Sequence, residues 1–174
     1  MDQKAIAPRD MSRLEKTSAR LRSQIACLGL VMERIAGMSG PVFELGLGRG
    51  RTYDHLRWHM PDRDIYAFDR EIVPIEDCRP PEEFIVAGDL EVTLPRHADR
   101  FAGQVVLANC DLGSYRQAHN QQMAALISPY LPQAVARGGF VCSDLPLTLE
   151  GFELLPLPEG AVEGHYRVFR RVDS

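Results

Sequence analysis

The sequence lacks the long apolar segments that would place a protein in a membrane or direct it out of the cell. No run approaches the roughly 20 apolar residues that span a bilayer. The first residues, Met1 to Lys4, are followed by no apolar core of a secretory signal. We therefore expect a cytoplasmic protein without a membrane partner.

The sequence also lacks paired cysteines and an excess of positive charge. Its cysteines form no Cys-x-x-Cys pair, which argues against a zinc knuckle and a disulfide framework and favours free thiols. They are Cys27, Cys78, Cys110 and Cys142. The formal net charge of -4 and the isoelectric point near 5.7 give no broad positive field. A phosphate backbone would be repelled, so this composition argues against a nucleic acid partner.

No internal repeat, low-complexity tract or long charge block divides the chain. A length of 174 residues with 45% hydrophobic residues matches one domain with a substantial core. The sequence therefore predicts a single domain over residues 1–174. The breaker-rich segment 77–81 lies between two strand-like runs and is interpreted as a loop.

An amphipathic helix is predicted over about residues 12–36. Its apolar residues recur at helical spacing and form a stripe of Leu14, Leu21, Ile25, Leu28, Met32 and Ile35. Gly37, Gly40 and Pro41 favour an end to the helix. The stripe suits packing on the protein's own sheet or a seam between two copies of the chain. The stripe covers fewer than four heptads, which favours packing on the protein's own sheet. A homo-oligomer that forms through this helix remains an alternative.

Beyond this helix, short apolar runs alternate with helical patterns and glycine-rich turns. The runs indicate strands at 42–45, 65–68, 84–87, 104–108 and 140–143, with helices near 53–60 and 115–128 and a helical turn after Pro129. Continuously apolar strands are buried on both faces, as in a parallel sheet flanked by helices. The fold class is therefore predicted as doubly wound α/β. Segments 152–155 and 166–169 favour a terminal antiparallel hairpin.

A glycine-rich turn follows the first predicted strand, with Glu-Leu-Gly-Leu-Gly-Arg-Gly at 44–50. Glycine permits a sharp turn and lets a ligand approach the main chain closely. The nicotinamide and flavin fingerprint is not met, because Arg51 occupies the position of its third glycine. The turn predicts a site for another nucleotide-like ligand.

Acidic residues follow the next two predicted strands. Asp69 ends the second strand, where a carboxylate can accept hydrogen bonds from ribose hydroxyls, and Asp89 occupies the matching place after the third. Doubly wound folds bind ligands at this end of the sheet. The ends of three consecutive strands thus place the glycines, an acceptor for the ribose and an acceptor for the adenine edge at the same end of the sheet.

With these features the chain resembles the class I S-adenosylmethionine-dependent methyltransferases. The resemblance rests on the motif at 44–50, Asp69, the Gly-Asp-Leu at 88–90, and Gly138 with Gly139 before the fifth strand, and it spans about 41–171. It implies a Rossmann-like sheet of seven strands with an antiparallel terminal strand, preceded by the extra N-terminal helix. It also implies S-adenosyl-L-methionine as cofactor and a methyl acceptor, either a small molecule or a protein.

The resemblance further implies roles for individual residues. Glu44 and the glycines would hold the methionine end, Asp69 the ribose, and Asp89 with Leu90 the adenine. The predicted cofactor-binding residues are Glu44, Gly46, Gly48, Gly50, Arg51, Thr52, Asp69, Arg70, Gly88, Asp89, Leu90 and Asn109.

Catalysis requires few groups, because a sulfonium methyl is already electrophilic and needs mainly an aligned nucleophile and, for some acceptors, a base. Asp111, Tyr115 and His119 follow the fourth strand and are the candidate catalytic residues. Alternatively, Tyr115 only packs and Asp111 caps the next helix. The segment 109–115 differs from the Pro-Pro-Tyr motif of relatives that methylate amino groups of nucleic acid bases.

The sequence also leaves two other functions open and contains one histidine pair with the spacing of metal ligands. The same fold suits an aminopropyltransferase-like enzyme or a non-catalytic nucleotide-binding protein. His55 and His59 lie one helical turn apart, a spacing that two metal ligands can use. No partnering glutamate and no obvious third ligand accompany them. The sequence therefore predicts no metal.

Overall fold

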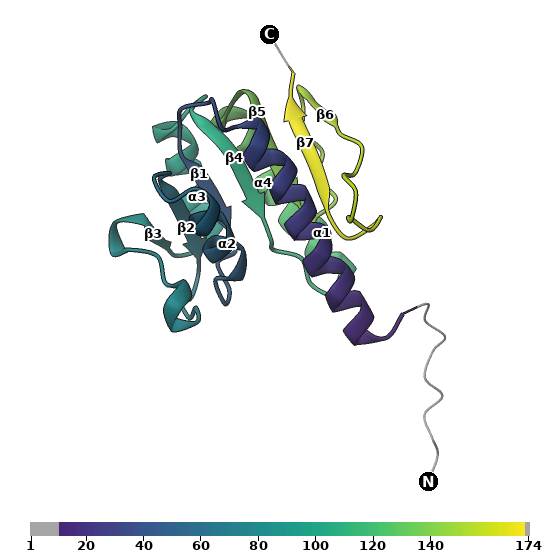
Figure 1. Cartoon of the computed structure of the whole chain (residues 1–174). Helices are drawn as coiled ribbons and strands as arrows, with labels where there is room; N and C mark the ends of the chain where they lie inside the picture. Colours follow the sequence, from purple (N-terminus) through teal and green to yellow (C-terminus); the bar gives the residue numbers. More distant parts are fainter. Residues whose placement is uncertain (1–10, 173–174) are drawn as a thin grey trace.

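The computed structural model of the chain describes residues 11–172 and contains one mixed sheet. Its strands are β1 (Val42–Leu45), β2 (Ile65–Asp69), β3 (Ile85–Ala87), β4 (Val105–Cys110), β5 (Val135–Ser143), β6 (Phe152–Leu154) and β7 (Arg167–Arg171). They lie in the order β3-β2-β1-β4-β5-β7-β6, as Figure 1 shows. β1 to β5 pair in parallel, whereas β7 runs antiparallel to both β5 and β6. The predicted fold and the terminal hairpin are confirmed.

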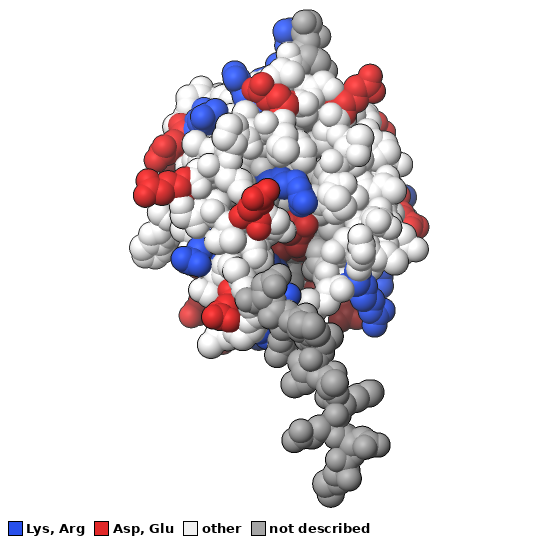
Figure 2. Space-filling model, turned by 90° about the vertical axis from the view of Figure 1, so that its right-hand side faces the viewer, with Lys and Arg blue, Asp and Glu red and all other residues white. Residues whose placement is uncertain are grey.

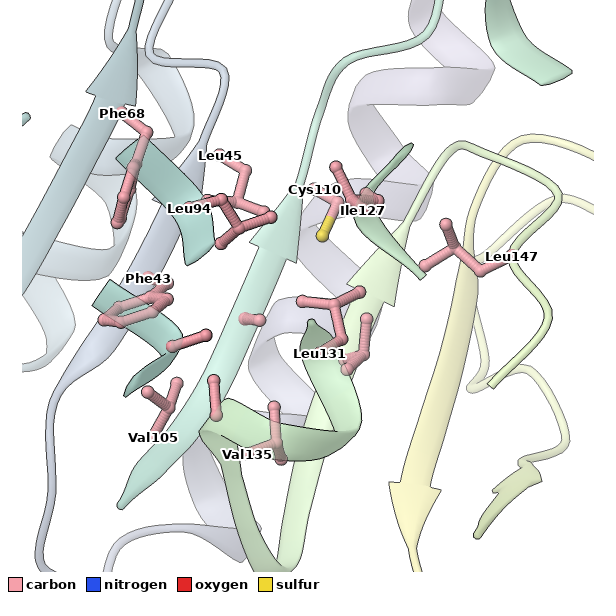
Figure 3. Close-up of a cluster of buried hydrophobic side chains, with 14 of the residues drawn as sticks. Phe43, Leu45, Phe68, Leu94, Val105, Cys110, Ile127, Leu131, Val135 and Leu147 are labelled. Atoms are coloured by element: carbon pink, nitrogen blue, oxygen red, sulfur yellow. The ribbon is translucent and has the colours of Figure 1, made fainter. Parts of the chain in front are cut away.

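Helices cover both faces of the sheet. They are α1 (Arg13–Arg34), α2 (Arg51–His59), α3 (Leu90–Arg100), α4 (Gln117–Ile127) and α5 (Leu131–Ala134), with short 3-10 turns η1 (Glu76–Cys78) and η2 (Glu82–Phe84). α1 and α2 share one buried apolar cluster with the sheet. α3, α4 and α5 share the other, which includes Phe43, Leu94 and Ile127 (Figure 3). This two-sided burial is the reason for the continuously apolar strands.

The N-terminal helix packs on its own sheet, as the sequence favoured. It begins at the capping box formed by Ser12 and Glu15, in which the Ser12 N–H donates to Glu15 Oε2 at 2.7 Å. The buried face differs in part from the predicted stripe, because Leu14 is 79% and Ile25 58% exposed. Small and polar residues of the helix are buried instead, among them Ser23. A homo-oligomer through this helix stays a prediction.

Ser23, on the buried side of α1, has one hydrogen bond within the helix and one to the segment between β6 and β7. The Ser23 hydroxyl donates to the Ala19 carbonyl at 2.7 Å and accepts the Val162 N–H at 2.9 Å. The apolar spacing alone could not reveal this face, because its positions include residues that usually point to solvent.

The helix α3 was not predicted, and β5 is longer than expected. In α3 only Leu94 and Ala98 are buried, and Pro95 stands inside the helix, so its sequence gives a weak helical signal. β5 begins at Val135, and Gly138 lies within it with a φ of 73°. The register between β4 and β5 shifts near this point. The irregularity explains why the sequence suggested a strand only from residue 140.

The helices, the cysteines and the charged side chains can be compared with what the composition predicts. No helix within residues 11–172 is long and apolar enough to cross a membrane, and the cytoplasmic location stays a prediction. All four cysteines are free, and all but Cys78 are buried.

Figure 2 shows the side of the molecule that lies to the right in Figure 1. Acidic and basic side chains are interspersed there, and neither sign forms a continuous patch.

Candidate active site

A cavity of about 850 Å³ lies at the carboxyl ends of β1 to β4. The loop after β1, the ends of β2, β3 and β4, and the helices α1 and α4 contribute its walls. Doubly wound folds bind ligands at this edge of the sheet. All of the predicted cofactor-binding residues except Glu44 and Asn109 line the cavity.

The glycine-rich loop is attached to the end of β2 by hydrogen bonds. The Gly46 and Leu47 N–H groups donate to the Phe68 carbonyl at 2.9 and 3.1 Å. The Gly48 N–H donates to Asp69 Oδ2 at 2.7 Å. Asp69 therefore holds the loop in place and also borders the cavity.

Gly50 shows why the loop requires glycine. Its φ of 81° lies in the left-handed region, immediately before the first residue of α2. A Cβ at this position would lie 2.7 Å from Cys78 Cβ and 2.8 Å from the Cys78 carbonyl oxygen. The loop thus depends on glycine both for its backbone conformation and for its packing against η1.

An ion pair forms the far end of the cavity, beyond β2 and β3. Arg70 Nε lies 2.7 Å from Asp89 Oδ1, and both side chains are largely exposed. Gly88 and Leu90 line the same end. The structure therefore brings together the residues that the resemblance assigned to ribose and adenine.

Glu44 and Asn109 lie behind the cavity wall, fully buried between the sheet and the helices on its α1 side. They are register partners in β1 and β4, and Asn109 Nδ2 donates to Glu44 Oε2 at 2.7 Å. The Thr52 hydroxyl donates to the other Glu44 oxygen, and the Tyr166 hydroxyl donates to Asn109 Oδ1. Burial raises the pKa of Glu44 to about 8, against the lowering effect of its hydrogen bonds with Thr52 and Asn109.

The four side chains Thr52, Glu44, Asn109 and Tyr166 form one buried chain of hydrogen bonds. It connects α2, β1, β4 and the residue before β7. Thr52 also reaches the cavity. This geometry fits a role for Glu44 and Asn109 in fixing the cavity wall.

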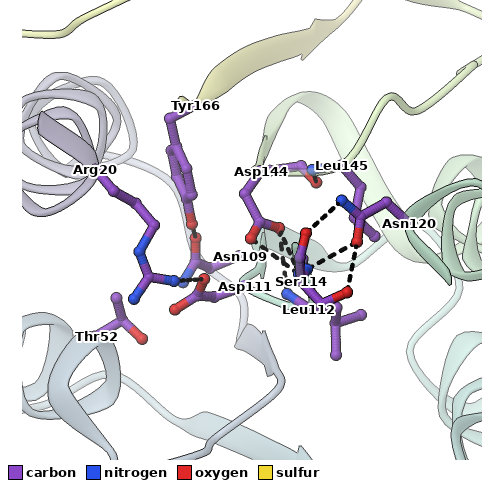
Figure 4. Close-up of polar contacts among 12 residues, drawn as sticks. Arg20, Thr52, Asn109, Asp111, Leu112, Ser114, Asn120, Asp144, Leu145 and Tyr166 are labelled. Atoms are coloured by element: carbon purple, nitrogen blue, oxygen red, sulfur yellow. Dashed lines mark hydrogen bonds and ion pairs between the residues drawn. The ribbon is translucent and has the colours of Figure 1, made fainter. Parts of the chain in front are cut away.

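The end of β4 supplies charged groups on the opposite side of the cavity. Asp111 lines it, and Arg20 of α1 lies 3.2 Å from Asp111 Oδ1 (Figure 4). Asp144, after β5, accepts the Gly113 N–H at 2.9 Å and the Leu112 N–H at 3.2 Å. Burial and, secondarily, the charge of Asp111 raise the pKa of Asp144 to about 7. Asp144 therefore fixes the loop that carries Asp111.

The three candidate catalytic residues separate in the structure. Asp111 and His119 line the cavity. Tyr115 is 82% exposed and lies outside the cavity wall, with the Arg13 guanidinium 5.2 Å from its ring centre. Tyr115 thus connects the loop after β4 with the beginning of α1.

Sequence reasoning missed four residues that shape the site, namely Arg20, Gln24, Asp144 and Tyr166. Arg20 and Gln24 line the cavity from α1. Their spacing of one helical turn places both on one face of α1, but no local pattern indicates that this face borders a cavity. Tyr166 and Asp144 act through contacts between distant parts of the chain, for which the sequence pattern gives no sign.

A second cavity, of about 1000 Å³, lies at the opposite edge of the sheet, where Pro41 and Asp64 precede β1 and β2. His55 and His59 line it, with their ring centres 4.7 Å apart. Burial and the charge of His59 lower the pKa of His55. No group of three or more potential metal ligands occurs among residues 11–172, and independence from metal stays a prediction.

Comparison with known proteins identifies the family. Residues 11–171 match a family model described as S-adenosyl-L-methionine methyltransferase. A crystal structure of an S-adenosyl-L-methionine methyltransferase from Silicibacter pomeroyi DSS-3 is 44% identical, with a TM-score of 0.89 over 93% of this chain and 99% of that one. No match was found among curated proteins.

More distant solved structures share the fold. Magnesium protoporphyrin IX methyltransferase from Synechocystis PCC 6803, with bound S-adenosylmethionine, is 15% identical with a TM-score of 0.55. The match covers 96% of this chain and 87% of that one. The antibiotic-resistance methyltransferase Kmr is 13% identical with a TM-score of 0.53, over 83% of this chain and 92% of that one.

Proposed function

Because the chain belongs to the S-adenosyl-L-methionine methyltransferase family and uses that cofactor, we propose that the cofactor binds in the cavity at the carboxyl ends of β1 to β4. The nucleoside end lies beside Asp69 and Asp89, and the methionine end lies beside Gly46 and the end of β4. One observation carries this proposal. The glycine loop, the two acidic strand ends and Asp111 all border the same cavity.

The residues present fit such a cofactor. Asp69 and Asp89 supply acceptors for hydroxyl and amino groups. A Cβ at Gly48 would meet nothing within 4 Å, so the backbone at this glycine lies open. Gln24 lines the cavity from α1. These features match a ligand that carries hydroxyl and amino groups.

The bound cofactor supplies an electrophilic methyl group, and the protein's task is to align the acceptor with it. Thr52, Glu44 and Asn109 keep the wall behind the glycine loop rigid through buried hydrogen bonds. Asp111 and His119 are the ionisable side chains on the β4 and α4 side of the cavity. On this proposal one of them receives the proton that the acceptor loses.

The acceptor is a small molecule on this proposal. α1 approaches the loop after β4 at two points, through Arg20 with Asp111 and through Arg13 with Tyr115. On this proposal both contacts lie on the side where the acceptor approaches the methionine end. A small molecule fits between α1 and the loop after β4 more readily than a folded protein surface does.

Calorimetry and an acceptor screen test the proposal. S-adenosylmethionine and S-adenosylhomocysteine are expected to bind the purified protein, and NAD is not. Methyl transfer from radiolabelled cofactor is then measured with a cell extract divided into small-molecule and protein fractions. Label in the small-molecule fraction supports the proposal. Label in the protein fraction alone would overturn the acceptor class, and a lack of cofactor binding would overturn the site.

A further inference from the structure

The apolar stripe of α1 divides into a buried part and an exposed part. α1 lies along one face of the sheet on the outside of the molecule (Figure 1). Leu28 and Ile35 are fully buried in the cluster that α1 shares with the sheet. At 3.6 residues per turn, the less buried members fall within roughly 40° of one another around the helix. We call these members the outer stripe, and they are Leu14, Leu21, Ile25 and Met32.

The outer stripe continues into the second cavity, which has a volume of about 1000 Å³. Ile25 and Met32 line this cavity from α1, and His55 and His59 line it from α2. Trp58, next to His59, is 80% exposed. The cavity is therefore a groove between the two helices, with large apolar side chains exposed beside it. Exposed apolar patches of this kind mark interaction surfaces.

Gly29 leaves an open place on the groove side of α1. It lines the cavity, and a Cβ at this position would meet nothing within 4 Å. Glycine weakens a helix interior relative to alanine, and no neighbouring atom of the chain excludes a larger residue here. The distance at which two helices pack depends on the side chains at their contact. A glycine at this place therefore lets a second helix approach α1 closely.

Two exposed residues of opposite charge flank the outer stripe on the same side. Arg22 and Glu33 are about three helical turns apart and differ by roughly 20° around the helix. Neither residue forms an ion pair within residues 11–172. If two α1 helices pair antiparallel with Ile25 opposite the partner's Gly29, Arg22 comes beside the partner's Glu33. Parallel pairing would instead bring like charges to the same level.

We propose that a second copy of the chain docks on this surface, with the two α1 helices antiparallel about a twofold axis. Ile25 packs against the partner's Gly29, and Leu21 packs against the partner's Met32. The N-terminal half of each α1 thereby lies in the groove beside the C-terminal half of the other. A twofold interface is self-complementary, so each of these contacts and the ion pair between Arg22 and Glu33 occur twice.

Sedimentation velocity at micromolar protein concentration tests the proposal. Wild type should have twice the 19.5 kDa mass of one chain. Gly29→Lys should have the mass of one chain, because lysine occupies the space that the partner's Ile25 needs. Its fold should be unchanged, since the position is open and lysine suits a helix better than glycine does. Gly37→Lys is the matched control, because Gly37 lies beyond α1 with nothing within 4 Å of its Cβ position. It should stay dimeric.

A charge exchange tests the antiparallel arrangement. Arg22→Glu and Glu33→Arg should each raise the Kd of the dimer about tenfold, since each breaks both symmetry-related ion pairs. The double variant restores opposite charges and should return to within about threefold of wild type. A monomeric wild type, or a Gly29→Lys variant that stays dimeric, would overturn the proposed surface. A double variant as weak as the single ones would overturn the antiparallel pairing.

Discussion

Asp69 connects the glycine loop with the proposed ribose contact. Its Oδ2 accepts the Gly48 N–H, and its side chain borders the cavity. We expect Asp69→Ala to weaken S-adenosylmethionine binding about ten- to 150-fold, because a hydrogen bond to a charged group contributes roughly 1.5 to 3 kcal/mol. Calorimetry on the folded variant measures the change.

Asp62→Ala is the matched control for this substitution. Asp62 is exposed and borders the other cavity, at the opposite edge of the sheet. Asp62→Ala removes one negative charge from the protein, as Asp69→Ala does. Its affinity for S-adenosylmethionine should stay within about twofold of wild type, since long-range charge effects are screened by salt. Equal affinities for Asp69→Ala and wild type would contradict the ribose assignment.

Glu44 predicts a pH dependence of stability. Burial raises its pKa from 4.5 to about 8, so the folded protein favours the protonated carboxyl. This contribution to stability is full below pH 4.5 and is lost as pH rises through 8. Between these values the free energy of unfolding should fall with pH, with a slope of at most about 1.4 kcal/mol per pH unit from this group.

Glu44→Gln removes the titrating group while its carbonyl can still accept from Asn109 and its amide can donate to Thr52. Urea unfolding between pH 5 and 9 should therefore give a flatter dependence for the variant than for wild type. Parallel curves for the two proteins would show that Glu44 is ionised across this range in the fold.

Among the elements, the loop between β1 and α2 contains Gly46, Gly48 and Gly50, all with a positive φ. Gly50 and Gly164 have similar φ values of 81° and 83°, but a Cβ would collide with Cys78 only at Gly50. Alanine at either position incurs a left-handed backbone cost of about 1–2 kcal/mol. At Gly50 the collision should add roughly 1–3 kcal/mol.

Denaturant unfolding of Gly50→Ala and Gly164→Ala measures this difference directly. Since the backbone strain is matched, the difference between the two variants reports the contact between the loop and η1. Equal destabilisation would mean that the loop moves away from Cys78 at little cost. Gly50 would then be needed for its backbone conformation alone.

The strand segments and the terminal hairpin were predictable from the sequence, whereas parts of the helices were not. A strand buried on both faces is apolar throughout, and this pattern is visible in 42–45 and 65–68. In α3 only two residues are fully buried and Pro95 weakens the pattern. The buried face of α1 includes Ser23 and Gln24, which apolar periodicity cannot detect.

The residues of the candidate site that follow consecutive parallel strands were predictable from the sequence. Glycines and acids at the ends of consecutive parallel strands must lie at one edge, so Gly48, Asp69 and Asp89 were found. Arg20 reaches Asp111 across 91 positions of the chain. No local pattern encodes such a contact, and the burial of Glu44 behind the wall likewise depends on the assembled fold.

For the whole molecule, cofactor binding should stabilise the folded state. A ligand present at 100 times its Kd adds about 2.7 kcal/mol to the free energy of unfolding. For a chain of 174 residues this corresponds to a rise in Tm of roughly 5–11 °C. Thermal scans should show this rise with S-adenosylhomocysteine and none with NAD. A rise with NAD alone would contradict the cofactor assignment.

A crystal structure of the protein with S-adenosylhomocysteine tests the central claim most directly. The account predicts electron density in the cavity at the ends of β1 to β4, with the ribose hydroxyls within hydrogen-bond distance of Asp69 and the adenine beside Asp89 and Leu90. A nucleoside seated in the second cavity, beside His55 and Arg63, would contradict it.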